Sequence, residues 1–175
     1  MPNIKKLFSN LLLLMASLLV MFITIEFGFK ILHFFSDAEV SPTKIEGLPY
    51  ENTPNGWFLR HSQVSGKWIF YKHNSLGMRD IERNFQKEND TKRILVLGDS
   101  VMYGGEVQFN NIFSRQLEAL LNDENIEVLN CGTTSYSLKE YPIYFKEKGI
   151  KFSPDLVIVG LCLNDYKTFF PEKEE

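Results

Sequence analysis

A serine, a glycine and an asparagine follow three apolar segments at equal distances, and this pattern could support acyl transfer. Ser100 comes directly after RILVLGD, Gly132 follows IEVLN with one cysteine between, and Asn164 follows DLVIVGLCL, so that they lie 32 residues apart. One strand-helix-strand unit takes about 30 residues, which predicts that all three lie at the same edge of a parallel sheet. A serine hydroxyl can attack a carbonyl carbon, while N–H groups stabilise the oxyanion that forms.

The chemistry of an acyl transfer assigns a role to each of these residues. We expect Ser100 to be the nucleophile, with its own backbone N–H, that of Gly132 and the side-chain amide of Asn164 as the oxyanion donors. Glycine lets a backbone N–H come close to a substrate, and asparagine is a neutral donor. The alternative for Ser100 and Asn164 is a role as turn residues. Asp99 and Asp165 are expected to order their turns through their carboxylates, not to act as a triad acid.

The elements that must position these residues alternate between strand and helix patterns. The continuous apolar run at 93–98 predicts a strand that is buried on both faces, and two further strands are expected at 126–130 and 155–163. A helical stripe occupies 110–123, and a second helix is expected from the capping box of Ser137 and Glu140 to Gly149, a typical left-handed residue after a helix. This order predicts an α/β fold, a three-layer sandwich with a parallel sheet. A β-hairpin is expected before it, at 57–73.

The N-terminus has the composition of a membrane anchor. Residues 7–25 carry no charge, and at about 1.5 Å per residue they can cross a hydrocarbon core of roughly 30 Å. Lys5 and Lys6 precede them, which favours a single pass through the inner (cytoplasmic) membrane with the rest of the chain on the extracytoplasmic side. A cleaved signal peptide is the alternative. We therefore expect an anchor at 1–35, a Pro- and Gly-rich linker at 36–56, and the α/β domain at 57–175.

Composition excludes some partners and cofactors from the prediction. The chain has 19 basic and 22 acidic residues, which gives no support for nucleic acid as a partner. Neither Cys131 nor Cys162 belongs to a metal-binding pattern, and we expect no metal and no cofactor. Both cysteines are expected to be small buried residues, and a disulfide between them is the alternative.

Three segments resemble the conserved blocks of the SGNH (GDSL-type) hydrolases: ILVLGDSVMYGG, VLNCGTTSYS and PDLVIVGLCLND. The preceding YKHNSLGMRD resembles the lead-in of membrane-anchored bacterial members, so the resemblance covers residues 71–166. It implies an SGNH/flavodoxin-like fold with esterase or O-acyltransferase activity. The implied nucleophile is Ser100, and the implied oxyanion hole consists of Ser100, Gly132 and Asn164. The implied substrates are ester-bearing small molecules, polysaccharides or lipids of the cell surface, including O-acetyl groups.

The family's catalytic histidine, in an Asp-x-x-His block, has no counterpart in this sequence. His33, His61 and His73 all precede Ser100, and the two on the hairpin are expected to be ordinary, partly exposed residues. The strand at 155–163 would also form an uncovered apolar edge if the sheet stopped there. Both features predict a fragment, the N-terminal part of an SGNH-type domain that is incomplete at its C-terminus.

Two other functions stay open at this point. One is a catalytically inactive fragment or binding module that keeps the oxyanion pocket. The other is a flavodoxin-like nucleotide or phosphate binder, although GDSVMYGG lacks the lysine of a P-loop and the G-x-G-x-x-G spacing. Asn74 and Arg79, in NSLGMRD, are expected to order the segment before the sheet, and contact with substrate is the alternative.

Overall fold

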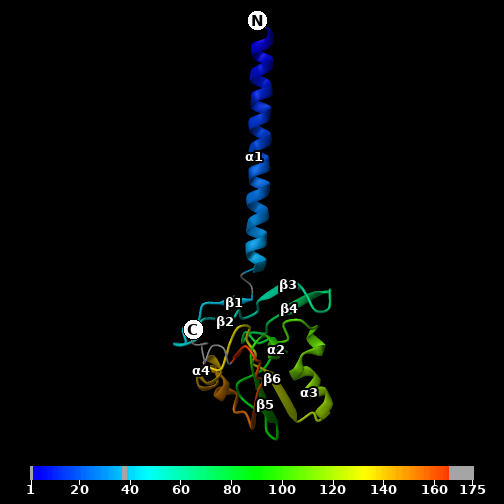
Figure 1. Ribbon diagram of the computed structural model, residues 1–175, viewed down its shortest axis with the longest axis vertical. Coiled ribbons are helices and arrows are strands. Elements are labelled where there is room, and N and C mark those ends of the chain that lie inside the picture. The colour runs from blue at the N-terminus through cyan, green and yellow to red at the C-terminus, as the bar shows by residue number, and fades with distance from the viewer. Residues whose placement is uncertain (1, 37–38, 166–175) are drawn as a thin grey trace, which may run out of the picture. The chain divides into compact units, whose positions relative to one another are not determined.

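The computed structural model describes residues 2–36 and 39–165 and contains two units, residues 1–37 and 38–175 (Figure 1). The first unit is the helix α1 (Pro2–Ser36). Its segment Asn3–Ile31 is long and apolar enough to cross a membrane, and large apolar side chains are exposed all around it. One ion pair joins Glu26 to Lys30 on the next turn, with 2.9 Å between nitrogen and oxygen. An N-terminal apolar helix of membrane-spanning length is therefore confirmed.

A parallel three-stranded sheet forms the centre of the second unit. Its strands are β5 (Lys92–Leu97), β6 (Ile126–Asn130) and β7 (Leu156–Val159), in the order β6-β5-β7. The predicted α/β class and parallel pairing are confirmed. The third strand ends at Val159 and not at residue 163, because the chain turns after Gly160, whose N–H donates to the Leu97 carbonyl at 2.8 Å.

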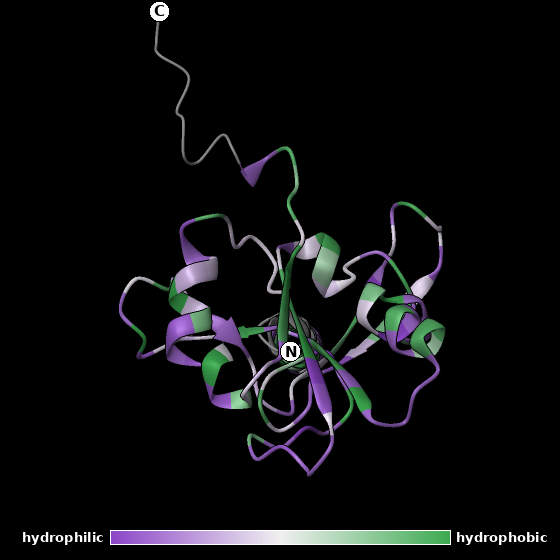
Figure 2. Cartoon of the chain, turned by 90° about the horizontal axis from the view of Figure 1, so that it is seen from below, coloured by the Kyte–Doolittle hydropathy of each residue, from purple (hydrophilic) through white to green (hydrophobic). Residues whose placement is uncertain are grey.

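Two helices cover opposite faces of this sheet, α3 (Phe113–Leu121) and α4 (Glu140–Glu147), as Figure 1 shows. Leu95 and Leu129 pack with Tyr144 of α4 and with Phe152 of the 3₁₀ turn η2 (Gly149–Phe152). The helix α3 packs along β6. Figure 2 shows that the strands are largely hydrophobic, whereas the helices also carry hydrophilic residues. Two short elements, α2 (Ser100–Tyr103) and η1 (Phe109–Asn111), lie between β5 and α3.

The predicted hairpin is present as β3 (Trp57–His61) and β4 (Trp68–Lys72), which pair antiparallel. One face of the hairpin is buried, where Phe58, Ile69 and Tyr71 pack with Tyr103 of α2. Side chains alternate between the two faces of a strand, so their neighbours Leu59 and Phe70 point the other way. The hairpin therefore packs directly on the short helix that begins with Ser100.

The segment that was expected to be a linker is largely packed onto the second unit. Residues 39–56 contain the strands β1 (Val40–Ser41) and β2 (Glu51–Asn52), which pair with each other. Leu48 belongs to the hydrophobic core, and the Tyr50 hydroxyl donates to the Thr134 carbonyl at 2.6 Å. Pro and Gly predict turns, but they do not prevent a segment from packing when apolar side chains lie between them.

The ends of α4 differ from the predicted ones. Ser137 donates to the Glu140 carboxylate through its N–H at 2.9 Å and its hydroxyl at 2.7 Å, but the helix begins only at Glu140. Gly149 does not take the left-handed conformation, which Ser153 adopts with φ of 50°. A β-carbon at position 149 would lie 3.0 Å from the Phe145 ring and 3.1 Å from Leu95. Glycine therefore lets these two side chains pack closely, and a β-carbon would require them to shift slightly.

Candidate active site at the end of strand β5

Ser100 is the first residue of α2, directly after the central strand. The Asp99 carboxylate accepts the Val101 N–H at 2.9 Å and caps this helix, as predicted. Gly104 ends the helix in the left-handed conformation, with φ of 84° and its N–H 3.1 Å from the Ser100 carbonyl. The first N–H groups of a helix have no acceptor within the helix, so the Ser100 N–H has none within α2.

Ser100 lines a pocket of about 420 Å³. The other walls are Arg60 of β3, Thr134 after β6, and the residues after Ser100: Val101, Gly104, Gly105, Glu106 and Val107. Glu39 joins two walls, because its carboxylate pairs with Arg60 and accepts the Thr134 hydroxyl at 3.0 Å. A pocket of this size can hold a small acyl group.

Gly132 lies in close contact with α2. A β-carbon at this position would collide with the backbone of Met102 and Tyr103, so only glycine lets the loop after β6 approach so closely. Its N–H donates to the Asn130 side-chain oxygen at 3.0 Å. To bind an oxyanion, this N–H would have to share or leave that acceptor.

Asn164 is exposed in the turn after β7 and is not among the residues that line the Ser100 pocket. Its neighbour Asp165 is buried, and one carboxylate oxygen accepts the Cys162 N–H at 2.9 Å and the Tyr141 hydroxyl at 3.0 Å. Burial raises the pKa of Tyr141 above its usual range, and the hydrogen bond to Asp165 acts in the same direction. Asp165 therefore orders its turn, as predicted. Ser100 begins α2 and Gly132 packs against the backbone of the same helix, whereas Asn164 is not part of the pocket lining.

The histidine nearest this region is held in a structural role. His73 is fully buried, with Nδ1 2.9 Å from the Thr53 carbonyl and Nε2 2.8 Å from the Tyr103 hydroxyl. A carbonyl only accepts, so Nδ1 carries the proton and Nε2 accepts from Tyr103. Burial lowers the pKa of His73 and keeps the ring neutral. The expectation that His73 is partly exposed is wrong, because the end of the hairpin packs under α2.

The second hairpin histidine, His61, is exposed. Its ring contacts the Trp68 ring edge to face, with 5.3 Å between the two ring centres. In the described part of the chain, neither His61 nor His73 is hydrogen-bonded to Ser100. His33 lies in α1. The structure therefore leaves the general base of the predicted reaction unassigned.

Arg79 holds two residues of the pocket lining through their backbone carbonyls. It is fully buried, and its guanidinium donates to the Gly104 carbonyl and, at 2.8 Å, to the Val107 carbonyl. The guanidinium also lies 4.3 Å from the centre of the Tyr71 ring. Burial lowers the pKa of Arg79. Its structural role and that of Asn74, whose side chain accepts the Met78 N–H at 2.9 Å, agree with the sequence-based expectation.

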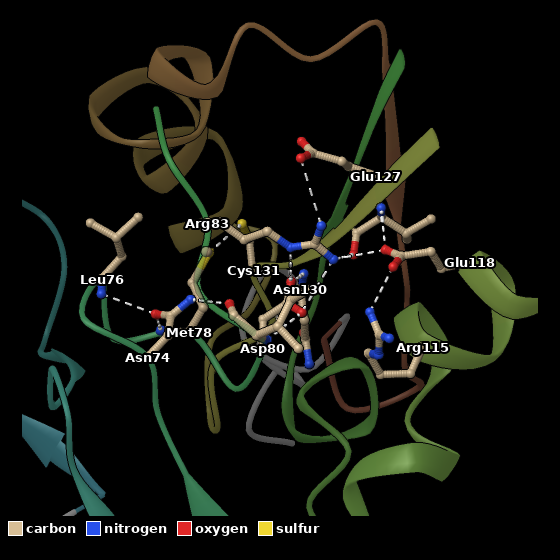
Figure 3. A network of polar contacts seen from close by, with 12 residues as sticks. Asn74, Leu76, Met78, Asp80, Arg83, Arg115, Glu118, Glu127, Asn130 and Cys131 are labelled. Atoms are coloured by element: carbon tan, nitrogen blue, oxygen red, sulfur yellow. Dashed lines mark hydrogen bonds and ion pairs between the residues drawn. The ribbon is translucent and has the colours of Figure 1, made fainter. Parts of the chain in front are cut away.

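A buried charged network fixes the loop after β6 (Figure 3). The Asp80 carboxylate accepts the Asn130 N–H at 3.1 Å and lies 3.2 Å from Arg83, which reaches Glu118 at 2.7 Å. Burial raises the pKa of Asp80, although Arg83 opposes the shift. Asn130 therefore connects this network to the N–H of Gly132.

Both cysteines are free thiols, so the alternative of a disulfide is wrong. Cys131 is buried, as predicted, with its sulfur 3.7 Å from that of Met78, and burial raises the pKa of its thiol to about 12. Cys162 is half-buried. Within residues 2–36 and 39–165, no three His, Cys, Asp or Glu side chains come together in a way that could hold a metal ion.

Sequence reasoning missed Glu39, Arg60 and Thr134, which shape the pocket. The alternation of the hairpin offered a signal for Arg60, since it shares the buried face with Phe58. Comparison of the chain with protein-family models, with curated proteins and with solved structures found no match. Membership of the SGNH hydrolases stays a prediction from the three sequence blocks.

Proposed function

We propose that this chain belongs to a membrane-anchored SGNH-type serine esterase or O-acyltransferase that acts on ester groups of cell-surface glycans or lipids. The observation that carries the proposal is the position of Ser100, partly exposed at the start of a helix after the central strand and within a pocket of about 420 Å³. The parallel sheet with helices on both faces supports a three-layer fold of this class. The apolar segment Asn3–Ile31 supports an anchor in the cytoplasmic membrane, with residues 38–175 outside the cytoplasm.

The proposed reaction begins when the Ser100 hydroxyl oxygen attacks the carbonyl carbon of the ester. The carbonyl oxygen becomes an oxyanion. Three donors would stabilise it: the N–H of Ser100, the N–H of Gly132 and the side-chain amide of Asn164. Collapse of this intermediate expels the alcohol and leaves an acyl group on Ser100. Water then completes a hydrolysis, or an acceptor hydroxyl completes a transfer.

The proton on the Ser100 hydroxyl needs a base, and the hairpin histidines do not fit this role. Both ring nitrogens of His73 are occupied, and His61 contacts Trp68 on the exposed side of the hairpin. We therefore expect this chain alone to turn over esters slowly, and to do so faster when imidazole in solution supplies the base. The same observation favours a second function, a module that binds ester groups without cleaving them.

The test is hydrolysis of p-nitrophenyl acetate by the full chain in detergent, with and without imidazole. Ser100→Ala should reduce the rate to that of imidazole alone, while Ser65→Ala, an exposed serine in the hairpin turn, should leave it unchanged. Mass spectrometry should find an acetyl group on the peptide that contains Ser100. Equal rates for the unchanged chain and Ser100→Ala would refute the esterase. Saturable binding of the ester under those conditions would support the binding module instead.

A further inference from the structure

The outward side of the hairpin carries a group of exposed apolar side chains. Leu59, Trp68 and Phe70 of the two strands are 50%, 63% and 53% exposed, and Val64 in the turn is 80% exposed. Leu59 lies directly opposite Phe70 in the strand register. We call these four residues the hairpin face. Exposed apolar patches on a folded unit mark sites that bind another protein or a membrane.

The charged side chains of the hairpin itself are all positive, although two acidic residues from other segments contact it: Glu39 pairs with Arg60, and the Glu106 carboxylate accepts hydrogen bonds from the turn. Residues 57–72 contain Arg60, Lys67 and Lys72 and no Asp or Glu. Lys72 lies in the strand register opposite Trp57, and Lys67 directly precedes Trp68. Tryptophan with lysine is typical of the interface between lipid and water, where cations also attract anionic headgroups. This chemistry fits a lipid surface better than a second copy of the same cationic hairpin.

The chain between α1 and Glu39, which contacts the hairpin, is short. Glu39 comes three residues after Ser36, the last residue of α1, and an extended chain of three residues spans at most about 11 Å. Glu39 is held within the second unit, because its carbonyl accepts the Thr53 N–H at 3.0 Å and its carboxylate pairs with Arg60 of β3. If α1 spans a bilayer, the hairpin is therefore confined to the vicinity of that bilayer.

We propose that the hairpin face lies on the surface of the bilayer in which α1 is anchored. Leu59, Trp68 and Phe70 would enter the headgroup region, and Lys67 and Lys72 would contact anionic headgroups. This inference rests on the membrane anchoring in the proposed function. It also narrows the substrate class to ester groups close to the bilayer, because Arg60, on the opposite and buried face of the same hairpin, lines the Ser100 pocket.

The tryptophans of the chain provide a specific probe. The sequence has two, Trp57 and Trp68, and both belong to the hairpin. In the Trp57→Phe variant of the full chain, all tryptophan emission comes from Trp68. This variant is reconstituted into vesicles of phosphatidylcholine and phosphatidylglycerol, with or without bromine on the acyl chains close to the headgroups. Bromine quenches tryptophan only at near contact.

We expect brominated lipid to remove at least about half of the Trp68 emission, and less when phosphatidylglycerol is omitted. Adding Leu59→Ser and Phe70→Ser should abolish most of the quenching. The matched control is Leu120→Ser on α3, which changes a side chain that is 80% exposed and should leave the quenching unchanged.

Flotation of the vesicles separates this inference from the anchor on which it rests. If the protein floats with the vesicles but bromine does not change the emission, the inference is wrong while the anchor stands. A shift of the emission to shorter wavelength that disappears on dilution, without quenching by bromine, would show a second copy on the hairpin face and overturn the inference. If the protein does not float, the anchor and the inference both fail. Ser100→Ala should keep the quenching, so a loss of esterase activity is a separate result.

Discussion

Replacing Arg79 by methionine should weaken the wall of the Ser100 pocket and destabilise the second unit. The guanidinium donates to the buried carbonyls of Gly104 and Val107, and a hydrogen bond from a charged group contributes about 1.5–3 kcal/mol. The stacking on Tyr71 adds about 1–2 kcal/mol in a desolvated position. Removing a buried cation restores part of this loss. The net effect should be a decrease of about 2–4 kcal/mol in the free energy of unfolding.

This decrease can be measured by urea and thermal unfolding of the full chain in detergent. A unit of this size should lose about 8–16 °C in Tm. Amide hydrogen exchange should become faster first at Gly104 and Val107, because their N–H groups lie in the turn that Arg79 holds. The control is Arg115→Met, which breaks a partly exposed ion pair with Glu118 and should cost less than about 1 kcal/mol. The reasoning is refuted if the two variants lose the same stability.

Three further predictions concern protonation, packing and thiol reactivity. Burial lowers the pKa of folded His73, so the unfolded chain binds its proton first. Above about pH 6.5 the neutral His73 contributes its full stability, and below this pH the free energy of unfolding should fall by up to about 1.4 kcal/mol per pH unit. Urea unfolding at a series of pH values measures this slope, and His73→Gln should flatten it. Gly132→Ala should lower the free energy of unfolding by about 1–3 kcal/mol, because the new β-carbon meets the backbone of α2. The control is Gly105→Ala, whose β-carbon would lie 3.3 Å from the Ser100 carbonyl oxygen and which should cost less than about 1 kcal/mol. Thermal unfolding of both variants measures the difference. Maleimide should label the half-buried Cys162 in the folded chain. It should label Cys131 only in denaturant, because this thiol is buried and burial raises its pKa to about 12. Mass spectrometry identifies the labelled cysteine.

The parts of the fold that could be predicted depend on short-range patterns. The strand at 126–130 has the same bounds in the structure, because its apolar residues follow the polar turn residues at 122–125 and precede the turn signals after Asn130. The role of Asp99 followed from its place between a strand and a helix, where a carboxylate can accept a nearby N–H.

The parts that could not be predicted depend on contacts between distant residues. The alternation of β4 places His73 on the same side as buried Ile69 and Tyr71, but the hydrogen bonds that hold its ring, to Thr53 and Tyr103, could not be predicted from this pattern. Glu39 lies in a segment rich in turn residues, and its partners Arg60 and Thr134 are 21 and 95 positions away. The Ser100 pocket therefore has one wall that local patterns predicted and others that required the tertiary structure.

The contacts of Glu39 determine how a mechanical force would act on this protein. A pull transmitted along the chain from α1 enters the second unit near Glu39, the first residue with described contacts there. Its hydrogen bonds to Thr53 and Thr134 and its ion pair with Arg60 would bear the load before the central sheet does. Because Arg60 and Thr134 line the Ser100 pocket, loss of these contacts would release two walls of this pocket.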